Sequence, residues 1–92
     1  MGMSQRVECP GGVPPWPTVA LRLGTPQMRM IDGQLAFPDE EPPADWRELR
    51  IAMNGVMVTV KRDEDAVEVV TWGNADENMR AAWDAVAAAF HV

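Results

Sequence analysis

The chain has 92 residues, of which 47% are apolar and 24% are charged. This length and composition fit one small globular domain, and they exclude a second domain of ordinary size and a wholly disordered chain. Eight basic residues against 14 acidic ones give a net charge of −6, which disfavours nucleic acids and anionic membranes as partners.

The first 17 residues are rich in proline and glycine. Pro14, Pro15 and Pro17 lack the backbone N–H donor, which disfavours a helix or a central strand. We therefore expect residues 1–17 to form an extended arm outside a single domain of residues 18–92. Trp16 in this arm either packs back on that domain or contacts a partner protein.

Three strands are predicted over residues 18–23, 28–31 and 34–37, because apolar and polar residues alternate there. A turn at residues 24–27 joins the first two strands and pairs Arg22 with Arg29. The Asp32-Gly33 dipeptide favours a two-residue hairpin turn, which pairs Met30 with Leu35. An acidic, proline-rich connector follows at residues 38–45.

The second half predicts three more strands, at residues 48–53, 56–62 and 66–72. Asn54-Gly55 is a strong signal for a two-residue hairpin turn, and it fixes the register of the first two strands. That register pairs Lys61 with Glu48, and the next turn pairs Lys61 with Glu68. Opposite charges on neighbouring strands support both registers.

The last segment changes to a helical period and carries one apolar stripe, formed by Met79, Ala82, Trp83, Val86, Ala87 and Phe90. Asn74 and Glu77 have the spacing of a capping box, so we predict a helix from about Ala75 to Phe90. The apolar stripe needs a cover, and one face of the sheet offers it. The predicted fold is α+β: an antiparallel meander sheet of five or six strands with one C-terminal amphipathic helix packed on one face.

This helix resembles the last helix of pleckstrin-homology domains through residues 75–77, Met79, Trp83, Val86 and Phe90. The resemblance is confined to the C-terminal segment. It implies an alternative fold, a partly closed barrel capped by the C-terminal helix. Lipid-binding members of that family use a basic first hairpin, whereas the turn at residues 24–27 is uncharged, so lipid binding is not expected.

Catalytic and metal-binding patterns are not found in the sequence. Cys9 and His91, the single cysteine and the single histidine, lie near opposite ends of the chain. The acidic residues at 63–65 lack the spacing of a calcium loop, and those in the connector are expected to stay solvated. We therefore expect a noncatalytic protein without metal or cofactor.

The same composition bears on the compartment. Cys9 has no second cysteine for an internal disulfide, which favours a reducing compartment. Apolar runs are only a few residues long, too short for a membrane span. Arginine accounts for seven of the eight basic residues and alanine is abundant. The sequence therefore suggests a bacterial, cytoplasmic protein.

The sheet face opposite the helix carries the candidate functional residues. The interface candidates are its apolar residues together with the arm tryptophan: Ala52, Met57, Val70, Trp72 and Trp16. The anion-binding candidates are its basic residues, Arg22, Arg29 and Arg50. Two alternatives without a functional role remain. The paired arginines extend into solvent or pair with carboxylates, and Trp72 is covered by the arm or by closure of the sheet into a barrel.

Two functions follow from these candidates. The leading hypothesis is a protein-interaction or scaffold module that forms a homodimer through its sheet. The alternative is a domain that binds a small anion or an acidic peptide on the arginine-bearing face.

Overall fold

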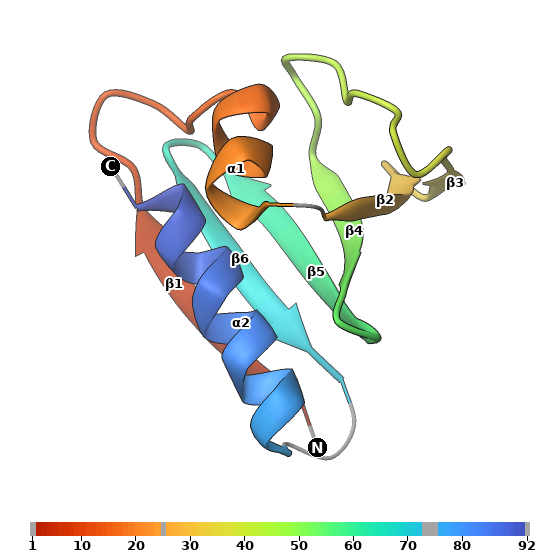
Figure 1. Cartoon of the computed structure of the whole chain (residues 1–92). Helices are drawn as coiled ribbons and strands as arrows, with labels where there is room; N and C mark the ends of the chain where they lie inside the picture. Colours follow the sequence, from red (N-terminus) through yellow and green to blue (C-terminus); the bar gives the residue numbers. More distant parts are fainter. Residues whose placement is uncertain (1, 25, 73–75, 92) are drawn as a thin grey trace.

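The computed structural model describes residues 2–24, 26–72 and 76–91. It consists of two layers, a six-stranded antiparallel sheet and two helices that lie on one of its faces (Figure 1). The elements in chain order are β1 (Met3–Glu8), α1 (Trp16–Leu23), β2 (Gln27–Ile31), β3 (Gln34–Leu35), β4 (Glu48–Met53), β5 (Val56–Asp63), β6 (Ala66–Thr71) and α2 (Glu77–Phe90). The predicted α+β class, with an antiparallel sheet and a C-terminal helix on one face, is confirmed.

The strand order is β1-β6-β5-β4-β2-β3, and the two outer strands do not pair with each other. The sheet is therefore open, and the alternative of a partly closed barrel is wrong. Both neighbours of β5 are antiparallel hairpin partners, so β5 lies within the sheet and β1 and β3 are its edges.

The predicted hairpins of the second half are confirmed. Lys61 pairs with Glu48 on β4 and with Glu68 on β6. Asn54 and Gly55 have φ angles of 51° and 77°, the left-handed conformation that a two-residue turn of this kind requires. Local turn chemistry therefore set these registers.

The predicted strand at residues 18–23 is wrong, because these residues belong to helix α1. Pro17 lies in the first turn of α1, where the missing N–H costs nothing. Trp16, Val19 and Leu23 follow a helical period and face the core, whereas Leu21, expected on the apolar side of a strand, is 85% exposed. Gly24 ends the helix with its N–H donating to the carbonyl of Ala20.

The N-terminal part of the predicted arm also differs from the prediction. Residues Met3–Glu8 are extended, but they form edge strand β1 and pair with β6. Gln5 pairs with Val69 and Val7 pairs with Val67, so Val7 is buried beneath the helices. The pairing partner lies about sixty positions away along the chain, beyond the reach of local sequence signals.

The middle of the sheet also differs from the predicted arrangement. Met30 pairs with Leu35 as predicted, but β2 lies between β3 and β4, so a simple meander does not form. A β-bulge at Arg29 shifts the alternation of β2. Met30 consequently shares a face with Arg50, and Ile31 packs towards the core.

Asp32 fixes the start of β4. Its carboxylate accepts hydrogen bonds from the backbone N–H groups of Arg47 (2.7 Å) and Glu48 (2.9 Å). These two N–H groups, first that of Arg47 and then that of Glu48, lower the pKa of Asp32 below its ordinary value.

This carboxylate predicts a pH-dependent contribution to stability. Because the folded-state pKa is lowered, the ionised Asp32 stabilises the fold above its unfolded pKa, and this contribution is lost as the pH falls through the folded pKa. We expect Asp32→Asn to be less stable than the parent at neutral pH, with the difference closing in acid. Urea unfolding of both proteins from neutral to acid pH checks this prediction. A difference in stability that does not depend on pH would contradict it.

Helix α2 packs on the same face of the sheet as α1 and covers the rest of the core (Figure 1). Asp76 is its N-cap and accepts a hydrogen bond from the N–H of Met79 at 2.8 Å. The predicted cap Asn74 lies outside the described residues. Trp83 is half-buried, and its Nε1 donates to the carbonyl of Val69 at 2.9 Å. Among the described residues, neither helix has the length and apolar character needed to span a bilayer.

Candidate functional site

Both helices pack on one face of the sheet, and the described residues form no second layer on the opposite face (Figure 1). We call this the uncovered face. The registers of the strands assign to it Ser4, Arg6, Glu8, Met30, Glu48, Arg50, Ala52, Met57, Thr59, Lys61, Glu68 and Val70. Four of the five predicted interface candidates belong here: Ala52, Met57 and Val70, with Trp72 directly after β6.

The centre of the uncovered face is apolar. Thr59 and Val70 pair with each other and are only 3% and 6% exposed, although no helix covers them. Trp72 beside them is 62% exposed and Met57 is 45% exposed. Large exposed apolar side chains over an apolar base are typical of an interaction surface.

A shallow cavity of about 340 Å³ lies at one end of this apolar centre. Trp72, Met57, Thr59 and Arg50 contribute to its lining, together with Met79 at the start of α2. The Nε atom of Arg50 is buried there without a hydrogen-bond partner within the described part of the chain. A buried donor without an acceptor is costly, so this guanidinium is suited to meet a polar group from outside.

Gly2 lies close to the indole ring of Trp72. A side-chain carbon added to Gly2 would meet the indole of Trp72 at 3.3 Å and the carbonyl oxygen of Thr71 at 2.5 Å. The close approach to the Thr71 carbonyl thus excludes a side chain at Gly2, and the backbone there lines a second small hollow with Ser4 and Val70.

Trp16 is not part of this surface, which corrects its assignment as an interface candidate. It is only 9% exposed and packs in the core with Val19 on the helix-covered side. The arm does not cover Trp72 through Trp16, because the two side chains belong to opposite faces of the sheet. The exposure of Trp72 is therefore a property of the folded chain.

The three anion-binding candidates do not come together. Arg22 lies on α1, on the other side of the sheet, where its Nη1 donates to the carbonyl oxygens of Ala89 (2.9 Å) and His91 (3.0 Å). Arg29, at the bulge, and Arg50 line different cavities. The predicted Arg22–Arg29 pair was wrong because it depended on a strand that is a helix.

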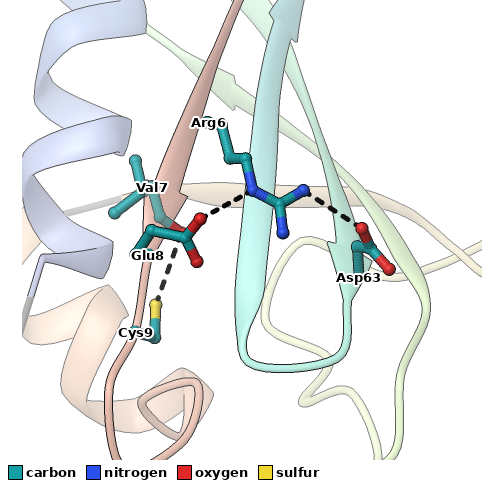
Figure 2. Close-up of polar contacts among 5 residues, drawn as sticks. All are labelled: Arg6, Val7, Glu8, Cys9 and Asp63. Atoms are coloured by element: carbon teal, nitrogen blue, oxygen red, sulfur yellow. Dashed lines mark hydrogen bonds and ion pairs between the residues drawn. The ribbon is translucent and has the colours of Figure 1, made fainter.

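The charges of the uncovered face form a regular pattern. The cross-strand row Arg6, Glu68, Lys61 and Glu48 alternates in sign from β1 to β4. Arg6 is held within its own chain: Nε donates to Glu8 at 2.9 Å and Nη1 to Asp63 at 3.0 Å (Figure 2). These carboxylates, Glu8 first, raise the pKa of Arg6. In residues 2–24, 26–72 and 76–91, Lys61 and Glu68 make no ion pair.

Cys9 has the environment of a structural thiol. Its side chain is fully buried, with Sγ 3.4 Å from the carbonyl oxygen of Phe90 and 3.8 Å from that of Val7. Burial, followed by the charges of Glu8 and Asp65, raises the pKa of this thiol. A nucleophilic cysteine needs the opposite shift.

A further hollow, on the helix side of the sheet, was not anticipated from the sequence. It has a volume of about 370 Å³, and the buried indoles of Trp16 and Trp46 contribute to its wall. The guanidinium of Arg62 lies over the Trp46 ring, 4.3 Å from its centroid, and donates to the carbonyl of Ala44. Burial and the charge of Arg47 lower the pKa of Arg62. These contacts tie the connector to the core.

Within the described residues, the structure shows no group of three or more side chains placed to hold a metal ion. Comparisons of the chain with protein-family models, curated proteins and solved structures find no match. The uncovered face is therefore the feature from which a function is inferred.

Proposed function

We propose that this chain is a noncatalytic protein-interaction module that self-associates through the uncovered face of its sheet. The observation that carries this proposal is the exposure of Trp72 and Met57, 62% and 45%, over the buried Val70 and Thr59. Tryptophan and methionine are enriched in interface cores, and here they lie on the face without a second layer. The single free and buried thiol of Cys9 fits the reducing cytoplasm in which we place the module.

A second copy of the chain is the partner we favour. Two-fold symmetry is the commonest arrangement of soluble oligomers, and it brings the same patch of both copies together. Six strands spaced by about 4.8 Å give a face roughly 25 Å wide. Strands of six residues make it roughly 20 Å long, so two copies bury about 1,000 Å² in total, which is at the lower end of specific interfaces. We therefore expect dissociation in the micromolar range.

The test is the solution mass of the wild type and of Trp72→Glu. We expect a wild-type mass approaching twice 10.2 kDa with rising micromolar concentration. Trp72→Glu removes this tryptophan from both copies, so it should raise the dissociation constant by more than about 30-fold, the effect of losing one interface tryptophan worth roughly 2 kcal/mol. Sedimentation equilibrium measures both.

Leu21→Glu is the matched control. Leu21 is 85% exposed on α1, on the other side of the sheet, so the same kind of change should leave the dissociation constant unaltered. Circular dichroism establishes that both variants fold. A wild type that stays monomeric throughout the micromolar range refutes the proposal.

A further inference from the structure

The row of charged residues across the uncovered face favours one orientation of two copies over the other orientations. Lys61 on β5 and Glu68 on β6 are directly paired, both are exposed, and neither is in an ion pair among the described residues. Arg6 continues the row beyond Glu68, and Glu48 continues it beyond Lys61. The signs read plus, minus, plus, minus.

When the order of this row is reversed, every charge lies opposite a charge of the other sign. Resting on the self-association proposed above, we infer that a second copy packs face to face with its two-fold axis parallel to the strands, between β5 and β6. This axis reverses the row, so that Glu68 of each copy faces Lys61 of the other. An axis along the row would instead place Lys61 on Lys61 and Glu68 on Glu68, which repel each other.

The same axis also matches the apolar part of the face. The pairing of β5 with β6 ends at Thr59 and Val70. Met57 lies two residues before Thr59 and Trp72 two residues after Val70, and both line the same cavity. Trp72 of one copy therefore faces Met57 of the other, a favourable contact between a thioether and an aromatic ring. Each Val70 faces the Thr59 of the second copy, so the buried apolar centres coincide.

The unpartnered guanidinium of Arg50 gains an acceptor in this arrangement. Arg50 pairs with Thr59 on one side of the axis, and Ser4 pairs with Val70 on the other. Reversal of this row places the Ser4 hydroxyl of the second copy opposite Arg50. The guanidinium of Arg50, whose Nε has no hydrogen-bond partner within the described residues of the single chain, thus has a polar group opposite it.

The experiment reverses the two central charges separately and then combines the variants. Lys61→Glu alone gives a dimer with two like-charged carboxylate contacts, and Glu68→Lys alone gives two like-charged ammonium contacts. We expect each variant to raise the dissociation constant about tenfold or more at low salt. An equimolar mixture, one variant carrying an affinity tag, should form heterodimers with wild-type affinity, because every facing pair is again of opposite charge.

Net charge is controlled with two substitutions on the exposed side of α2. Arg80→Glu changes the net charge as Lys61→Glu does, and Asp84→Lys changes it as Glu68→Lys does; both positions are exposed. These variants should dimerise like the wild type, and their mixture should show no gain. Thermal melts followed by circular dichroism establish that all four variants are folded.

The outcomes separate this inference from the proposed function. If Trp72→Glu dissociates the dimer but the charge variants do not, or if their mixture fails to recover affinity, the face is an interface and the inferred axis is wrong. A dimer unaffected by Trp72→Glu and by both charge variants points to pairing of the β1 edges, which overturns both statements. A monomeric wild type also overturns both.

Discussion

Trp46→Ala should destabilise the protein by about 3–5 kcal/mol, the usual cost of deleting a buried tryptophan. Trp46 is 2% exposed, and its ring meets that of Phe90 edge to face with centroids 6.1 Å apart. Its other surface carries the guanidinium of Arg62 at 4.3 Å. The variant therefore loses an aromatic contact and a cation–π contact as well as buried area.

A loss of this size is a large part of the stability of a small domain, which is about 5–15 kcal/mol. Urea unfolding followed by circular dichroism measures it. Phe37→Ala is the control, because Phe37 is an aromatic residue close to the connector that is 74% exposed. We expect this control to change the unfolding free energy by less than about 0.5 kcal/mol. Equal losses in the two variants would show that Trp46 does not hold the connector on the core.

Trp46 illustrates where sequence reasoning stops. It follows the proline-rich connector and belongs to no periodic segment, so neither a strand nor a helix pattern includes it. Its burial depends on Phe90, 44 positions later, and on the fold of the connector. A large aromatic residue next to a predicted strand was the only signal available, and it does not say which partner the ring meets.

The β4-β5-β6 hairpins were predictable because their information is local. The Asn54-Gly55 turn fixes the first register, and the paired charges of Lys61 and Glu68 support the second. Once these registers are known, alternation assigns Met57, Val70 and Trp72 to one face. The candidate surface was correct to the extent that it lay on these strands.

Helix α1 was missed because residues 16–23 satisfy two periods. Val19, Leu21 and Leu23 alternate as in a strand, while Trp16, Val19 and Leu23 recur as in a helix. Pro17 decides between them, because proline is favoured in the first helical turn and disfavoured within a sheet. The bulge at Arg29 and the edge pairing of β1 have no comparable local signal, since both depend on the partner strand.

Arg22→Ala should destabilise the fold by about 1.5–3 kcal/mol, the range for hydrogen bonds that involve a charged group. Arg22 donates to the carbonyl oxygens of Ala89 and His91 at 2.9 and 3.0 Å. These carbonyls lie at the C-terminal end of α2, where backbone acceptors lack helical partners and the helix dipole is negative. Because Arg22 is exposed, the lower end of the range is expected, and high salt should reduce the effect.

Arg22→Lys and Arg29→Ala make this prediction specific. Lysine keeps the charge but loses the planar fork that reaches two carbonyls, so Arg22→Lys should recover only part of the lost stability. Arg29 is exposed and makes no ion pair in the described chain, so Arg29→Ala should stay within about 0.5 kcal/mol of the parent. Urea unfolding at low and high salt measures all three. If Arg22→Ala unfolds like the parent while phosphate raises the melting temperature of the parent alone, Arg22 serves an anion site and its contact with α2 is incidental.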